Sequence, residues 1–174
     1  MWQLKLIGAA MILIGSTILG LEKSKKEENK IRTLQDINYM LVLLKGEMVY
    51  ERAALPDIYM HLSQKLSKPY NRFFEGLCEE MEHRRGRTME QIWRERVENS
   101  TKDWVMEEKD RQEFLQLGNF WGYIDISLQE SALELYKEKL EYRIKEMQST
   151  IKDRQRIYSM LGVLSGLFLG ILLF

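Results

Sequence analysis

The two ends of this chain are apolar, and the residues between them are highly charged. Residues 6–21 contain only Ser16 and Thr17 as polar side chains, and residues 157–174 contain no charged side chain. A helix of about twenty apolar residues crosses the hydrocarbon core of a bilayer. We therefore predict three parts: an N-terminal transmembrane helix over residues 1–21, a charged domain over residues 22–156, and a C-terminal transmembrane helix over residues 157–174.

The first apolar segment has a second interpretation, a cleaved signal peptide, because the basic residue Lys5 precedes the apolar run. The residues from Ser16 to Glu22 lack a clean small-x-small cleavage site, so we expect a retained span. Lys and Arg residues gather on the inner side of both segments, which predicts that the middle domain faces the cytoplasm at the cell membrane. These residues are Lys23, Lys25, Lys26, Lys30, Arg32, Lys152, Arg154 and Arg156.

Both predicted spans contain glycines at spacings that suit close helix packing. Gly162, Gly166 and Gly170 recur every fourth residue, and Gly8 and Gly15 lie seven residues apart. Small residues on one face let helix backbones approach each other in lipid. We interpret these glycines as helix-packing positions. The simpler alternative, that membrane helices are rich in glycine in general, stays open.

The middle domain is predicted to be helical throughout. An apolar stripe at helical spacing, without Gly or Pro in residues 21–45, predicts a first helix that continues to about residue 54. Its members are Leu34, Ile37, Leu41, Leu44 and Met48. A second stripe predicts a last helix of about 30 residues that runs on into the membrane. Its members are Ile126, Leu133, Tyr136, Leu140, Ile144, Met147 and Ile151.

Four shorter helices are expected between these two. Pro56 opens one, because proline suits the first helical turn. The next covers about residues 69–85 and ends at Gly86. Thr88 and Gln91 fit a capping box that starts another. The last covers about residues 104–117 and stops at Gly118, and Asp125 can cap the following long helix. The expected fold class is an all-α six-helix bundle, with Phe73, Phe74, Trp93, Phe114 and Phe120 contributing to the core.

Residue patterns for catalysis are weak. Glu80 and His83 resemble half of a di-iron motif, but that site needs a second copy and further carboxylates. Cys78 lies five residues before His83, so the two do not share a helix face as a nucleophile and base would. The net charge of zero gives no basic surface for nucleic acid. We predict no enzyme activity, no metal and no cofactor.

Two segments carry a family resemblance when they are combined with the apolar ends. The first reads Leu44-Lys45-Gly46-Glu47-Met48-Val49-Tyr50 and continues to Leu55-Pro56. The second reads Leu115-Gln116-Leu117-Gly118 and continues to Gly122, Asp125 and Gln129. The chain resembles the stage III sporulation protein AB family of endospore-forming bacteria. That family in turn resembles the cytoplasmic domain of the type II secretion inner-membrane F protein.

The resemblance implies a role as well as a fold. It implies a platform component of a secretion-like channel between mother cell and forespore, in the mother-cell membrane, beside a cytoplasmic secretion-type ATPase and other stage III sporulation channel proteins. The F protein has two such bundles, so a single-bundle protein is expected to form homo-oligomers. The alternative is a membrane-anchored helical scaffold or sensor with another partner. The matching positions are Glu47, Tyr50, Pro56, Gly118, Gly122, Asp125 and Gln129, and the competing interpretation for each is a cap, a turn or core packing.

Overall fold

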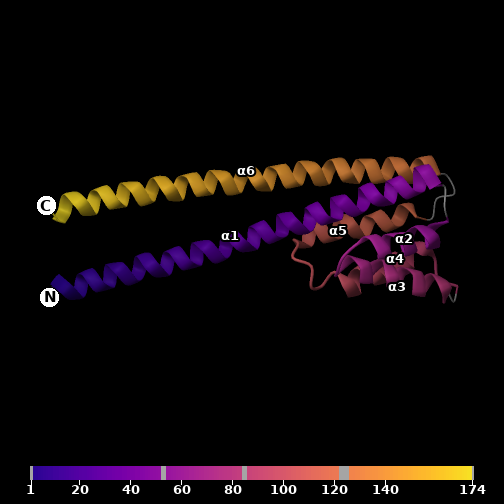
Figure 1. Cartoon of the computed structure of the whole chain (residues 1–174), viewed down its shortest axis with the longest axis horizontal. Helices are drawn as coiled ribbons and strands as arrows, with labels where there is room; N and C mark the ends of the chain where they lie inside the picture. Colours follow the sequence, from indigo (N-terminus) through magenta and orange to yellow (C-terminus); the bar gives the residue numbers. More distant parts are fainter. Residues whose placement is uncertain (1, 52–53, 84–85, 122–125, 174) are drawn as a thin grey trace. The chain divides into compact units, whose positions relative to one another are not determined.

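The computed structural model describes the backbone of residues 2–51, 54–83, 86–121 and 126–173. Side chains are described for most residues from 22 to 160. The chain divides into two compact units. Unit 1 comprises Met1–Ile31 and Arg143–Phe174, and unit 2 comprises Arg32–Tyr142. In unit 1, the first part of one long helix and the last part of another run in opposite directions, and both chain ends lie at the same end (Figure 1).

The described residues form six α-helices, one π-helical turn and one 3-10 turn, and they contain no β-strand. The two long helices are α1, Trp2–Gly46, and α6, Ile126–Leu173. The shorter helices are α2, Leu55–Lys65; α3, Tyr70–Glu82; α4, Met89–Ser100; and α5, Glu108–Gln116. The π turn η1 covers Glu47–Glu51, and the 3-10 turn η2 covers Leu117–Phe120. The predicted all-α class with six helices is confirmed.

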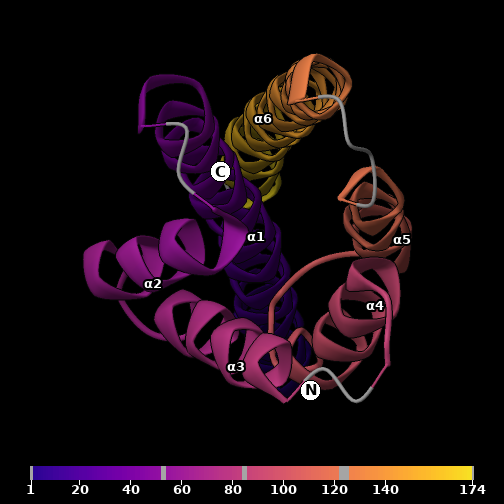
Figure 2. The same cartoon turned by 90° about the vertical axis from the view of Figure 1, so that its right-hand side faces the viewer.

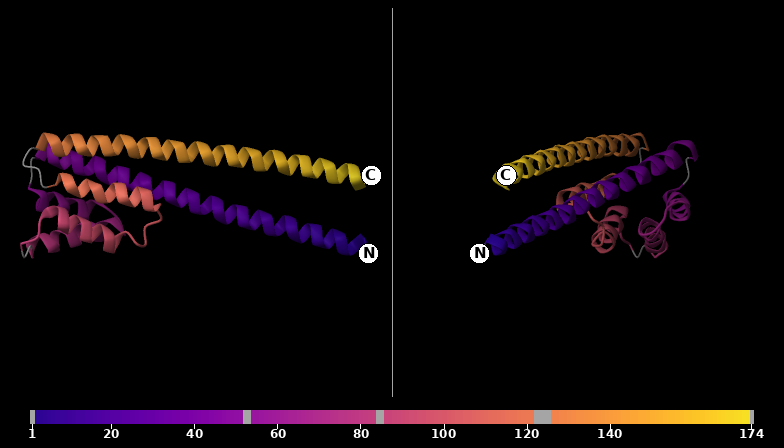
Figure 3. Two further views of the ribbon diagram at one scale, coloured as in Figure 1. Left: turned by 180° about the vertical axis from the view of Figure 1, so that it is seen from behind. Right: turned by 60° about the vertical axis from the view of Figure 1, so that its left-hand side comes forward.

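The helices of unit 2 follow one another around a common core in chain order, as an end view shows (Figure 2). Neighbours in the chain pack on each other: α2 on α3, α3 on α4, and α4 on both α5 and η2. The ring closes where α1 meets α6, because Lys45 Nζ lies 2.7 Å from Glu134 Oε2 and 3.4 Å from Glu130 Oε1. The predicted side-by-side placement of the first and last helices is thus observed in unit 2 (Figure 3).

Helix boundaries follow local chemistry where the sequence gives a strong signal. Thr88 accepts a hydrogen bond from the backbone N–H of Gln91, and the Gln91 side chain accepts one from the backbone N–H of Thr88, so the predicted capping box is confirmed. Pro56 lies in the first turn of α2, as predicted. Gly86 has a positive φ of 81°, a conformation that glycine adopts without a steric penalty.

Two predicted helices have wrong boundaries. The first helix ends at Gly46 rather than near residue 54, and a π turn continues the chain. The fifth helix begins at Glu108 rather than near Trp104. The indole of Trp104 instead enters the core, with its ring centroid 4.7 Å from that of Tyr70 and 5.6 Å from that of Phe73. Burying so large a ring outweighs one more turn of helix.

The core was predicted well from the two stripes and less well elsewhere. All five stripe residues of α1 are buried. In α6, Leu133, Tyr136, Leu140, Ile144 and Met147 are buried, whereas Ile151 is half-buried and the side chain of Ile126 lies outside the described residues. Phe120 is also only half-buried, because the 3-10 turn directs the next residue, Trp121, inward instead.

Candidate functional site

The family-matching positions gather at one end of unit 2. At this end α1 passes into η1, α2 begins, η2 finishes and α6 begins (Figures 1 and 2). The structure describes the side chains of Glu47, Pro56, Gly118 and Gln129. Tyr50, Gly122 and Asp125 lie outside the residues whose side chains are described. The predicted cap by Asp125 is therefore untested.

Glu47 is a buried carboxylate held by two cations from α2. Its side chain is 5% exposed, its Oε1 lies 2.5 Å from Nζ of Lys65, and its Oε2 lies 3.1 Å from Nδ1 of His61. Removing a carboxylate from water is costly unless charged or polar groups replace the water. Glu47 therefore fastens the π turn to α2.

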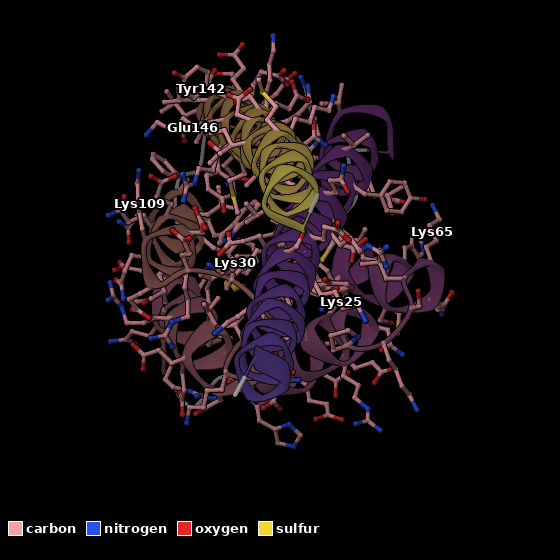
Figure 4. The ribbon with its side chains drawn as sticks, turned by 90° about the vertical axis from the view of Figure 1, so that its left-hand side faces the viewer. Lys25, Lys30, Lys65, Lys109, Tyr142 and Glu146 are labelled. Atoms are coloured by element: carbon pink, nitrogen blue, oxygen red, sulfur yellow. The ribbon has the colours of Figure 1, made fainter. Side chains whose placement is uncertain are left out.

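The two partners of Glu47 remain accessible to solvent. The side chain of His61 is 44% exposed and that of Lys65 is 53% exposed, and Lys65 extends outward from α2 (Figure 4). Since π turns interrupt α-helices frequently at functional sites, this one draws attention to the surface around it. We call Glu47, His61 and Lys65 the Glu47 site. It offers two donors to a partner from a fixed backbone.

Pro56 and Cys78 explain how α2 and α3 pack together. The backbone carbonyl of Pro56 accepts a contact of 3.7 Å from Sγ of Cys78. Cys78 is only 5% exposed, and burial, followed by the charge of Glu82, raises the pKa of its thiol. A thiol that stays protonated is a poor nucleophile. Cys78 is a packed core residue, in agreement with the sequence-based interpretation.

Gly118 is required by the indole of Trp93. A Cβ atom at residue 118 would overlap the Trp93 ring, which is 1% exposed. The ring is fixed because Nε1 of Trp93 donates a 3.1 Å hydrogen bond to the backbone carbonyl of Phe114. Gln129 is also buried, at 8% exposure. For Gly118 and Gln129, the observed environment is that of core packing.

The possible catalytic patterns are not assembled into sites. Glu80 forms an ion pair with Arg87 at 3.3 Å, and His83 ends α3 with its Nδ1 2.9 Å from the backbone carbonyl of Glu79. Among the residues that the structure describes, no three His, Cys, Asp or Glu side chains are grouped to hold a metal ion. A solvent-open hollow of about 270 Å³ lies between α4 and α5. Its lining consists of Thr101, Lys102, Trp104, Met106, Glu107, Glu108 and Arg111.

The glycines predicted to pack in the membrane lie on helix backbone. Gly8 and Gly15 belong to α1, and Gly162, Gly166 and Gly170 belong to α6. The surroundings of all five lie outside the described side chains, so their packing stays a prediction. Within the described residues, no helix combines the length and the apolar character that a membrane crossing needs.

Sequence reasoning missed two structural contributors near the site. Trp121 is 4% exposed and meets the ring of Tyr59 edge-on, with 6.4 Å between centroids. Lys45 joins α1 to Glu134, which lies 89 residues away in the chain. The hydrogen bond from Lys45, followed by that from Lys137, lowers the pKa of Glu134 to about 2. No periodicity in the sequence indicates such a distant ion pair.

Comparison with known proteins gives one consistent result. The sequence model of the stage III sporulation protein AB family matches residues 5–174. Stage III sporulation protein AB of Bacillus subtilis (strain 168) is 21% identical over 171 residues, which are 98% of this chain and 99% of that protein. A solved structure of stage III sporulation protein AB has a TM-score of 0.64 at 14% identity. The match covers 71% of this chain and 97% of the solved chain, and it shows a shared fold.

Proposed function

Because this chain belongs to the stage III sporulation protein AB family, we propose that it is a non-catalytic membrane platform of the secretion-like channel between mother cell and forespore. The observation that carries the proposal is the match of the family model to residues 5–174. A match of this length includes both apolar ends as well as the helical bundle. Membrane attachment and bundle are therefore proposed to act as one platform.

The distribution of charge supports a membrane location. The apolar residues 6–21 and 157–174 flank a domain that contains every charged side chain except Lys5. In the proposed arrangement the two ends are spans in the mother-cell membrane around the forespore, and the bundle faces the cytoplasm. A phosphatase fused after Phe174 should be active and a green fluorescent reporter should be dark. The opposite pattern would rule out a cytoplasmic bundle.

The proposed partners are a cytoplasmic secretion-type ATPase, the other stage III sporulation channel proteins, and further copies of this chain. We propose that the Glu47 site is a contact surface for the ATPase, because a buried carboxylate holds two exposed cations on a fixed backbone. Charged groups fixed before binding lose little conformational entropy when a partner docks. Lys65 is the accessible member that a substitution can change with least effect on the core.

Capture from sporulating cells tests this proposal. The tagged full chain should retain the ATPase, and Lys65→Glu should reduce the retained amount. Lys109→Glu is the matched control, since Lys109 is an exposed lysine on α5 (Figure 4). Equal loss with both variants would indicate a nonspecific charge effect. Retention of a different partner, with no channel protein present, would favour the alternative of a scaffold or sensor.

The span glycines provide a separate test. Gly166 lies between Gly162 and Gly170, and a leucine there should separate helices that pack closely, at a cost of about 1–3 kcal/mol. Gly166→Leu should reduce sporulation efficiency at an unchanged protein level. If leucines at all three positions leave sporulation unaffected, these glycines have no role in packing.

A further inference from the structure

An apolar stripe runs along the outer face of α6, away from the core of unit 2. Its members are Leu128, Leu135 and Tyr142, which are 52%, 56% and 73% exposed. Figure 4 shows Tyr142 on the outside of this helix. The three residues are spaced by seven, so they recur on one face of the helix, as residues of a coiled-coil seam do. We call them the α6 stripe.

Two unpaired charges of opposite sign accompany the stripe. Glu138 and Lys139 lie between Leu135 and Tyr142, and both are exposed. Their neighbours Glu134, Lys137 and Glu141 form ion pairs. In the described part of the chain, neither Glu138 nor Lys139 forms one. Apolar residues flanked by unpaired charges of both signs are typical of a surface that recognises another helix.

We propose that the α6 stripe docks a second copy of this chain, with the two α6 helices parallel. Across a two-fold axis parallel to the helices, each stripe residue meets its own counterpart. If the stripe occupies heptad position a, Glu138 occupies d and Lys139 occupies e. Positions d and e of facing parallel helices are neighbours, so each Glu138 lies beside the Lys139 of the other copy. The charges that the single chain leaves unpaired are thereby paired twice.

The parallel direction rests on the proposed function. The helix α6 continues to Leu173, and its last part is the proposed C-terminal span. Two copies in one membrane send these ends into the same bilayer, which a parallel pair of α6 helices permits and an antiparallel pair does not. Three apolar residues make a weak contact by themselves. Attachment of both copies to one membrane raises their effective concentration and favours the pair.

The first helix offers matched controls. Tyr39 and Val42 of α1 are exposed apolar residues, at 56% and 47%. They are followed on the same face by Gly46 rather than by further large apolar side chains at heptad spacing. Substitutions at Tyr39 and Val42 therefore change an exposed apolar side chain without touching the proposed seam.

Cysteine cross-linking of the full chain in native membranes tests the docking. In a Cys78→Ala background, Leu128→Cys, Leu135→Cys and Tyr142→Cys should each form a disulfide-linked species of twice the chain mass on mild oxidation. Tyr39→Cys and Val42→Cys should not. Links between Leu128→Cys and Tyr142→Cys chains, with self-links only at residue 135, would show an antiparallel pair and overturn the proposal. Adducts of any other mass would show a different partner and would also overturn it.

Charge exchange supplies a second, independent measurement. Glu138→Lys and Lys139→Glu, each added to Leu135→Cys, should lower the linked fraction by about tenfold, because like charges then face each other across the axis. The double variant should restore linkage. Failure to restore it would contradict the proposed pairing. If stripe links form while the ATPase is not captured, the platform proposal fails and the docking stands; the reverse result removes only the docking.

Discussion

Two halves of unit 2 bury different kinds of side chain. In α1 and α6 the core is mainly aliphatic, as in Leu34, Ile37 and Leu140. In the segment from α2 to η2 it is mainly aromatic: Phe73 alone lies within 5.7 Å, centroid to centroid, of Phe74, Trp93, Trp104 and Phe114. The aliphatic half consists of regular stripes on long helices. The aromatic half combines short helices and turns, so its geometry depends on how single rings fit together.

This contrast predicts how each half responds to substitution. An aliphatic stripe excludes water along a continuous seam, so a charge placed in it has no nearby partner. An aromatic cluster is sensitive to volume, because its rings interlock at fixed angles. The predictions below concern residues 22–156, which we expect to fold without the two ends as a helical monomer or weak dimer.

The largest effect is expected for Leu41→Asp in the aliphatic half. Leu41 is 2% exposed, so the substitution would bury an unpaired carboxylate. The loss should be about 3–5 kcal/mol of the roughly 5–15 kcal/mol that stabilises a small domain. Denaturant unfolding followed by circular dichroism measures it. Glu98→Ala, at an exposed position, is the control and should change stability by less than about 0.5 kcal/mol. Unfolding of Leu41→Asp at the parent midpoint would show that α1 is not a core helix.

A smaller effect is expected for Gly118→Ala in the aromatic half. The added methyl group would press on the Trp93 ring, and overpacking of this kind costs about 1–3 kcal/mol. The near-ultraviolet circular dichroism of the tryptophans should change along with the melting temperature. The double variant Gly118→Ala with Trp93→Leu tests the cause, because removing the ring should cancel most of the penalty from the methyl group. Additive losses would contradict the proposed clash.

Thr88→Ala should cost about 1 kcal/mol, the usual value for an N-cap. The substitution removes the acceptor for the backbone N–H of Gln91 at the start of α4. Thr88→Ser keeps a hydroxyl acceptor and should remain near the parent in a thermal melt. An equal loss for both would mean that the methyl group of Thr88 matters and that the cap does not.

The smallest effect is expected at the ion pair that closes the ring. Lys45→Met should lower the melting temperature slightly at neutral pH, since the pair is about one-third exposed. The Lys45 ammonium lowers the pKa of Glu134 to about 2 from its ordinary 4.5. A depressed carboxyl pKa stabilises the fold above the ordinary value, and this contribution is lost as pH falls from about 4.5 towards 2. Melts across this range should show a shallower decline for Lys45→Met than for the parent. Parallel declines would exclude a coupling between the two residues.

The candidate site was predicted only in part. Residues such as Glu47 and Gly118 were identified from the resemblance, and the structure shows what each contacts. Nothing in the sequence pairs Glu47 with His61 and Lys65, since a carboxylate near a helix end is ordinarily solvated. The π turn that turns Glu47 inward has no sequence signature comparable to the capping box at Thr88.

The sequence by itself determined the all-α class, the two long amphipathic helices and most helix starts, because these depend on periodicity, proline and capping groups within a few residues. Only the tertiary structure decided where the chain leaves regular helix. Trp104 and Trp121 lie at such places, and each abandons helical continuity for a position in the aromatic core. The gain from burying a large ring arises from partners far away in the chain, and it exceeds the small local preference of the backbone.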